Sequence, residues 1–261
     1  GRRTRPLYDG AVLFRSLLAE ATVQLCTRFT ALQNRLRLAS CPPRGLTETM
    51  RVTKHEHACL RLDSEGKTLL IDPGSFTLPL DDLNDVVGVV LTHEHPDHWT
   101  PAQLDAVFSQ APGVPVFGPE GVVAAASGYD VTKVDVGDEL EVGPFRMRFF
   151  GGTHSVIHES IPVIDNLGVL VNDEFYYPGD SYAVPEGVEV GLLAAPIGAP
   201  WLKIGDAIDF VLAVKPRRAF GTHEMTLSRA GLAMHRDRLK WATEQNGGEF
   251  LELEPGQSAD L

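Results

Sequence analysis

The chain has 261 residues, of which 43% are hydrophobic, so it can bury a sizeable core without a disulfide or a structural metal. Its net charge of −12 disfavours nucleic-acid binding, which depends on Lys and Arg to neutralise phosphates. The sequence has no stretch apolar enough to span a membrane, and its three cysteines, without a CxxC pair, predict a reduced, cytoplasmic protein.

The first fifty residues differ in charge from the rest. Residues 1–49 carry eight arginines and three acidic residues, a net charge of +5, which leaves −17 for residues 50–261. We therefore predict an N-terminal extension over residues 1–49, helical or disordered, ahead of a single domain over residues 50–261. Apolar residues recur in the extension at steps of three and four, as in an amphipathic helix: Leu13, Leu17, Leu18, Ala21, Leu25, Phe29, Leu32 and Leu36.

Three interpretations of this extension stay open. The first is a helix that covers an apolar patch or mediates dimerisation. The second is an Arg-rich targeting segment. The third is sequence upstream of a natural start at Met50. We prefer the third interpretation, because Met50 opens directly into a strand pattern.

From Met50 onward the sequence predicts short strands and a few helices. Strands are expected first at 50–54, 58–62, 67–71 and 86–91, the last a nearly pure Val/Leu run typical of a buried strand. A helix follows at 101–108, with Thr100 as its N-cap and Pro101 in its first turn. A strand at 114–117 and an Ala-rich helix at 119–127 complete this half.

The second half has the same mixture of elements. Two helices are expected, at 206–214 and at 228–245, the latter with Ser228 as a possible N-cap. Strands are expected at 131–136, 139–142, 145–150, 167–171, 175–177, 188–194, 219–221 and 250–253. Two strand-rich halves that each carry helices favour two sheets packed face to face, with the helices outside.

A cluster of metal-type ligands follows the strand at 86–91, in the segment Thr92-His-Glu-His-Pro-Asp-His98. His93 and His95 are two residues apart, so in an extended chain they point to the same side and can bind one metal together. Pro96 bends the loop, so that Asp97 and His98 can reach a second metal. Imidazole and carboxylate groups suit Zn²⁺, Mn²⁺ or Fe²⁺, and four of them in six residues predict a metal site rather than a His-rich surface loop.

Three further candidate ligands follow later strands. His154 lies in Gly151-Gly-Thr-His154, Asp180 in Pro178-Gly-Asp180 and His223 in Gly221-Thr-His223. Glycine permits tight turns and close approach of the backbone. Their shared position at strand ends, beside small residues, favours a role as metal ligands.

The order of these candidate ligands resembles that of the metallo-β-lactamase superfamily, over residues 50–250. The residues that carry the resemblance are His93-x-His95-x-Asp97-His98, His154, Asp180 and His223. The motifs His57-Ala-Cys59, Leu70-Ile-Asp72-Pro-Gly74 and Pro178-Gly-Asp-Ser181 resemble the superfamily's ascorbate-6-phosphate lactonase-like branch of cytosolic zinc-dependent hydrolases. The resemblance implies an α/β (α+β) fold, a four-layer αββα sandwich with metals at one edge of the paired sheets.

The resemblance also implies two divalent metal ions, most often zinc, with manganese or iron in some branches. One metal would bind His93, His95 and His154. The other would bind Asp97, His98 and His223, and Asp180 would bridge the two. A hydroxide bridging the metals would cleave an ester-type bond of a small-molecule substrate. Asp97 would orient this hydroxide and relay a proton. The resemblance to the lactonase-like branch favours a phosphodiester or a lactone as the substrate.

Four more residues are candidates for substrate binding. His57 is expected near the site from the resemblance, and His158 lies four residues past His154. Trp201 and Lys203 could shape a pocket and bind an anionic group. A structural or solvated role is the alternative for each of the four. Separately, Asp72 is predicted to orient a ligand histidine.

Other functions that use the same fold are less consistent with the sequence. The pattern of diiron oxidoreductases usually has Glu where this chain has His95, and the chain lacks a flavin domain. A non-catalytic metal-binding module would be expected to have lost ligands, whereas all seven are present. Many secreted β-lactamases carry Cys or His in place of Asp180, and the acidic charge disfavours a nuclease.

Overall fold

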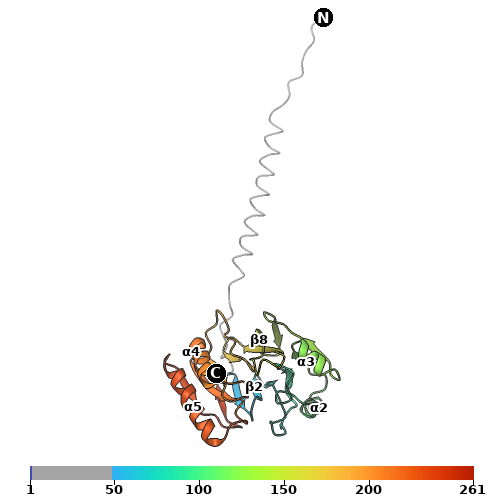
Figure 1. Ribbon diagram of the computed structural model, residues 1–261. Coiled ribbons are helices and arrows are strands. Elements are labelled where there is room, and N and C mark those ends of the chain that lie inside the picture. Colours follow the sequence, from blue (N-terminus) through green and yellow to red (C-terminus); the bar gives the residue numbers. More distant parts are fainter. Residues whose placement is uncertain (2–48) are drawn as a thin grey trace. The chain divides into compact units, whose positions relative to one another are not determined.

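The computed structural model describes Gly1 and residues 49–261, so the expected N-terminal helix lies outside the described residues. Within residues 49–261, fourteen strands form two seven-stranded sheets. Helices α2 and α3 lie on one side of the paired sheets, and α4 and α5 lie on the other (Figure 1). The predicted four-layer αββα sandwich is confirmed.

The first sheet has the strand order β14-β1-β2-β3-β4-β5-β6. Strands β14, β1, β2 and β3 pair antiparallel, and β3 to β6 pair parallel. Parallel neighbours need crossover connections, and α2 (Pro101–Gln110) and α3 (Glu120–Ala125) lie in those that lead to β5 and β6. The strands are β1 (Arg51–Lys54), β2 (Leu60–Ser64), β3 (Lys67–Ile71), β4 (Val86–Val90), β5 (Val116–Gly118), β6 (Val131–Lys133) and β14 (Ser258–Asp260).

The second sheet, β13-β12-β11-β10-β9-β8-β7, is built in the same way. Strands β7 to β10 pair antiparallel, and β10 to β13 pair parallel. Helices α4 (Ile204–Val214) and α5 (Arg229–Glu244) connect the parallel strands. The strands are β7 (Glu139–Val142), β8 (Phe145–Thr153), β9 (Asp165–Val171), β10 (Phe175–Tyr177), β11 (Leu192–Pro196), β12 (Arg218–Thr222) and β13 (Glu249–Leu251).

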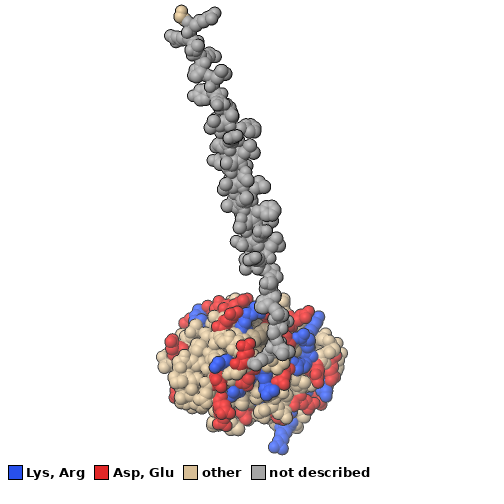
Figure 2. Space-filling view, turned by 180° about the vertical axis from the view of Figure 1, so that it is seen from behind, with Lys and Arg blue, Asp and Glu red and all other residues tan. Residues whose placement is uncertain are grey.

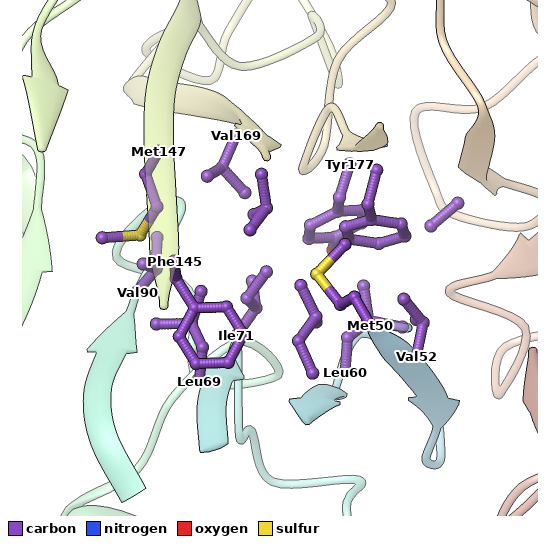
Figure 3. Close-up of a cluster of buried hydrophobic side chains, with 14 of the residues drawn as sticks. Met50, Val52, Leu60, Leu69, Ile71, Val90, Phe145, Met147, Val169 and Tyr177 are labelled. Atoms are coloured by element: carbon purple, nitrogen blue, oxygen red, sulfur yellow. The ribbon is translucent and has the colours of Figure 1, made fainter. Parts of the chain in front are cut away.

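The main core lies between the two sheets. Figure 3 shows Leu60, Leu69 and Ile71 of the first sheet close to Phe145 and Tyr177 of the second. The alternate residues pack outward against the helices: Leu70 and Val89 lie with α2, and Leu170 and Tyr176 lie with α4. Because both faces are covered, these strands are continuous apolar runs, and each fully buried Leu or Phe side chain contributes about 1.5–3 kcal/mol to folding.

Several element boundaries differ from the prediction. The strand expected at 188–194 is β11 at Leu192–Pro196, because Val190 is buried among the residues that pack on α4 rather than paired with β10. The last strand, β14, was not predicted. It is short and mostly polar, and it pairs at the sheet edge through Arg51 opposite Asp260, so it lacks an apolar pattern. The Leu261 N–H then donates to the Met50 carbonyl at 2.8 Å.

The surface carries both signs of charge. Figure 2 shows acidic and basic side chains interspersed over one face. None of the helices within residues 49–261 is long and apolar enough to cross a membrane.

Candidate metal centre

The seven predicted ligands all follow strand ends. The loop His93–His98 follows β4, and His154 and His223 come directly after β8 and β12. Asp180 follows β10 after a two-residue turn. Backbone hydrogen bonds join these segments, because Leu167 N donates to the Thr92 carbonyl at 2.9 Å and Ser155 N donates to the Asp180 carbonyl at 2.8 Å.

The structure brings the seven side chains together at one place. Among the residues it describes, three sets each place one ligand atom per residue within 4.8 Å of one another. The first set is His93, His95, His154 and Asp180, the second is His98, Asp180 and His223, and the third is His57, Asp97 and His223. Asp180 belongs to the first two sets and His223 to the last two, so the sets form one continuous cluster.

Four of the histidines are oriented by hydrogen bonds from Nδ1. The Nδ1 atom of His154 donates to the Ser155 carbonyl, and that of His223 donates to the Gly198 carbonyl, each at 2.5 Å. The Nδ1 atom of His98 donates to Asp72 Oδ2 at 2.7 Å. The Thr92 hydroxyl donates to Asp72 Oδ2 at 2.6 Å, which leaves its oxygen to accept from His93 Nδ1 at 3.1 Å. In a neutral imidazole a proton on Nδ1 leaves Nε2 with a lone pair, which is the state that ligates metals.

The Nε2 atoms of these histidines converge on a buried carboxylate. The Nε2 atoms of His98, His154 and His223 lie 3.2–3.4 Å from oxygens of Asp180. In the described part of the chain, these nitrogens and Asp180 Oδ1 are buried without a hydrogen-bond partner. Unpaired buried polar atoms are costly. Imidazole nitrogens and carboxylate oxygens that share one small space fit divalent metal ions.

The two acidic side chains of the cluster are held in their ionised form. Burial alone would raise the pKa of Asp180, but the neighbouring His223 and His98 hold it well below its ordinary value. Burial likewise opposes ionisation of Asp97, whose pKa is nonetheless lowered by the neighbouring His223 and His57. Conversely, burial disfavours a charged His223, but Asp180 and then Asp97 raise its pKa to about 9.

Asp72 supports the ligand loop of the first sheet. It accepts from Thr92 N at 2.8 Å as well as from Thr92 Oγ1 and His98 Nδ1, and it is fully buried. Asp72 thus contacts His98, and its predicted role in orienting a ligand histidine stays a prediction. Its backbone is left-handed, with φ 49°, as is that of His223, with φ 64°. Such strained conformations in non-glycine residues are commonly retained at functional sites.

Glycines allow the loops around the site to approach closely. A Cβ on Gly74 would lie 1.7 Å from the Asp97 carbonyl oxygen, so the segment after β3 packs directly on the ligand loop. Gly179, beside Asp180, has φ 62°, and a Cβ there would lie 2.4 Å from Asn166 Oδ1. Both positions therefore require glycine.

Asn166 was missed by the sequence reasoning. This fully buried residue of β9 accepts from Asp180 N at 2.9 Å and donates from Nδ2 to the Pro178 carbonyl at 2.9 Å. It therefore fixes the turn that presents Asp180. The available signal was an amide residue at the start of the otherwise apolar Leu167–Val171 run.

The four candidate substrate contacts lie in different environments. Trp201 Nε1 donates to Asp180 Oδ2 at 2.8 Å, and His57 Nε2 lies 3.1 Å from Asp97 Oδ2, so both border the candidate metal ligands. His158 is exposed and bonds to Ser160 at 2.7 Å. Lys203 is exposed and lies 3.5 Å from Asp206. A substrate role for all four stays a prediction.

Comparison with known families agrees with this geometry. Residues 51–223 match the family described as the beta-lactamase superfamily domain. The chain belongs to the metallo-β-lactamase superfamily. Protein Rv0786c of Mycobacterium tuberculosis is 35% identical over 215 residues, which cover 80% of this chain and 99% of that protein.

Solved structures support the same fold. Igni18, a metallo hydrolase of Ignicoccus hospitalis, matches with a TM-score of 0.62 at 18% identity, over 82% of this chain and 98% of that chain. CmlA, a diiron β-hydroxylase of Streptomyces venezuelae, matches with a TM-score of 0.62 at 15% identity, over 84% of this chain and 55% of that chain. At such identities the likeness shows the metallo-β-lactamase fold alone, and this fold carries both hydrolytic and oxidative chemistry.

Proposed function

We propose that the protein is a metal-dependent hydrolase that binds two divalent metal ions and cleaves an ester-type bond of a small molecule. Zinc is the expected metal, with manganese or iron as alternatives. The observation that carries the proposal is the buried Asp180 carboxylate, which is faced by unpaired Nε2 atoms of three histidines. The opposite nitrogens of those histidines are already bonded to protein oxygens, so the cluster is oriented for ligation.

The three sets of neighbouring side chains support a proposed assignment of residues to the two metals. His93, His95, His154 and Asp180 would hold one, and His98, Asp180 and His223, with Asp97 beside His223, would hold the other. Bound there, the metal ions would lower the pKa of a water molecule and polarise the bond to be cleaved.

Asp97 is proposed as the catalytic carboxylate. Its side chain is 26% exposed, whereas that of Asp180 is 3% exposed, so Asp97 is the acidic ligand that a substrate and a water can reach. It is held ionised by its histidine neighbours and can therefore accept a proton from the attacking water. A phosphodiester or a lactone is the favoured substrate. A cytoplasmic location and a homo-oligomer stay predictions.

The test combines metal content with activity. Protein purified without added metal is measured by inductively coupled plasma mass spectrometry and assayed with bis(p-nitrophenyl) phosphate and a panel of lactones. We expect close to two metals per chain and hydrolysis of at least one substrate. Asp180→Asn should lose metal and activity together, whereas His158→Gln, which alters an exposed histidine outside the ligand sets, should keep its metal.

The remaining outcomes separate the alternatives. Less than one metal per chain after reconstitution with zinc, manganese or iron would show that the ligand set is misread. Two irons per chain without hydrolysis of any substrate would favour the diiron oxidoreductase instead.

A further inference from the structure

His57 lies within the metal centre although it is none of the seven proposed ligands. It is fully buried in the connection between β1 and β2, and its ring centroid lies 3.8 Å from that of His223. Its Nε2 lies 3.1 Å from Asp97 Oδ2. Its backbone is left-handed, with φ 60°, a conformation that residues other than glycine rarely adopt. A buried, strained histidine beside the catalytic carboxylate calls for a specific role.

The hydrogen bonds of the ring define its tautomer. The backbone N–H of Met225 donates to His57 Nδ1 at 3.3 Å, so Nδ1 is an acceptor and carries no proton. In a neutral imidazole the proton is then on Nε2, which donates it to Asp97 Oδ2. A nitrogen that carries a proton has no lone pair for a metal. His57 is therefore not a ligand, although its Nε2 lies within reach of the same space as Asp97 and His223.

The backbone of His57 supports the same region. Its carbonyl accepts from His223 N at 2.8 Å and from Thr222 Oγ1 at 2.5 Å. His57 thus makes two kinds of contact from the β1–β2 connection of the first sheet. Its backbone bonds to the end of β12 and to His223 of the second sheet, and its side chain contacts Asp97. The ring of Phe76 packs edge-on against His57 at 4.7 Å between centroids and restricts its rotation.

We propose that His57 is a positioning residue, which donates a hydrogen bond from Nε2 to Asp97 and so fixes the orientation of the catalytic carboxylate. The inference rests on the proposed function, because Asp97 matters as ligand and base only in a metal-loaded hydrolase. It assigns His57 to Asp97 rather than to the substrate. Loss of the donor should therefore lower kcat and metal affinity and leave KM largely unchanged.

Two variants separate the donor from the shape of the ring. His57→Phe keeps a flat ring beside Phe76 but has no donor, whereas His57→Gln places a side-chain N–H₂ near the position of Nε2. Removing an orienting partner typically costs 10–100-fold in metal affinity or activity. We expect a loss of this size in both kcat and zinc affinity for His57→Phe, and recovery to within about fivefold for His57→Gln, since a hydrogen bond to a charged group is retained. Zinc affinity is measured by competition with a chelating dye, which does not depend on turnover.

A measurement on the unaltered protein keeps the inference testable if His57→Phe fails to fold. The zinc-loaded full chain, with ¹⁵N-labelled histidine, is examined by long-range ¹H–¹⁵N correlation spectra, and His57→Gln identifies the His57 signals. We expect an Nε2-protonated ring with an unprotonated Nδ1. A ring protonated on Nδ1, with the Nε2 shift of a zinc ligand, would overturn the proposal. So would a kcat for His57→Phe equal to that of the unaltered protein.

These outcomes are distinct from failure of the proposed function. If the unaltered protein binds no metal and hydrolyses nothing, the proposed function fails before His57 is tested. If it binds two metals and is active, but His57→Phe and His57→Gln lose activity equally, only the donor role of His57 is refuted.

Discussion

The two sheets contribute to the metal centre in different ways. The first sheet supplies four proposed ligands from the single loop His93–His98 after β4. The second sheet supplies the other three, His154, Asp180 and His223, from three separate strand ends. In the second sheet the ligand strands β8, β10 and β12 alternate with β9 and β11. The intervening strands carry orienting groups instead: Asn166 lies in β9, and the Gly198 carbonyl follows β11. The half of the site from the first sheet is thus local in sequence. The half from the second sheet depends on the register of five strands.

The largest expected effect concerns the buried ion pair that joins the two sheets beside the site. Lys54 of β1 is fully buried, and its Nζ lies 2.5 Å from Glu224 Oε1, next to His223. Lys54→Met leaves a buried carboxylate without its partner, which should lower the free energy of unfolding by about 3–5 kcal/mol.

Urea denaturation of a double-mutant cycle checks this expectation. Lys54→Met/Glu224→Met should recover most of the loss, because well-packed apolar residues can replace a buried pair. Lys67→Met, which removes the exposed pair with Asp85, is the matched control and should cost less than about 1 kcal/mol. If Lys54→Met and Lys67→Met lost the same free energy of unfolding, the buried pair would stabilise the contact between the sheets no more than an exposed pair does.

The orienting groups of the two sheets can be compared directly. Asp72→Asn removes the carboxylate that accepts from His98 and Thr92, so zinc affinity should fall about 10–100-fold. Asn166→Ala should weaken zinc binding by no more than about tenfold, because Trp201 also donates to the Asp180 carboxylate. Competition with a chelating dye measures both. The reverse order would indicate that the turn before Asp180, and not the first-sheet loop, limits metal affinity.

Metal binding should weaken as pH falls. The pKa of His223 is raised to about 9, and Asp180 and Asp72 raise that of His98 against the effect of burial. Below about pH 9 the metal-free His223 is protonated, so a metal must displace its proton, and affinity rises with pH up to about 9. Calorimetry in buffers of different ionisation enthalpy should detect more protons released on zinc binding at pH 7.5 than at pH 9.5. Equal proton release at both pH values would contradict the raised pKa of His223.

The smallest expected effect is at Lys203. Among residues 49–261 this exposed lysine forms an ion pair only with Asp206, so Lys203→Ala should leave metal content unchanged. If it contacts an anionic substrate, KM for a phosphodiester should rise by about fivefold at most, the range of an exposed ion pair, and KM for a neutral lactone should not change. A rise of the same size for the lactone would count against charge recognition by Lys203.

The local half of the site was the easier half to predict. Four ligand-type residues within six positions after the buried strand β4 are visible in the sequence, and so is the repeated placement of His154, Asp180 and His223 at strand ends. The orienting groups were mostly not visible. The carbonyls of Ser155 and Gly198 belong to the backbone and carry no residue-type signal, and Asn166 acts only because β9 lies beside β10.

The sequence predicted the four layers of the fold correctly, but it predicted the strands at the sheet edges less well. Buried strands such as β3 and β4 have strong apolar patterns because both faces are covered. Strand β14 has no such pattern, since an edge strand of three residues is held by backbone pairing and by the exposed contact between Arg51 and Asp260. The proposed role of His57 could also not be predicted from the sequence, because it depends on the Met225 N–H, which donates to Nδ1 of the ring.

The pairing of β14 with β1 has a practical consequence for engineering. Since Leu261 bonds to Met50, residues at opposite ends of the domain are neighbours, and a short linker could join them. A circular permutant opened at an exposed turn, such as that at Gly128, would then present Asp180 and His223 before His93 in the chain. The proposed metal centre should be unchanged in the permutant, because the fold, and not the order of the residues along the chain, brings the proposed ligands together.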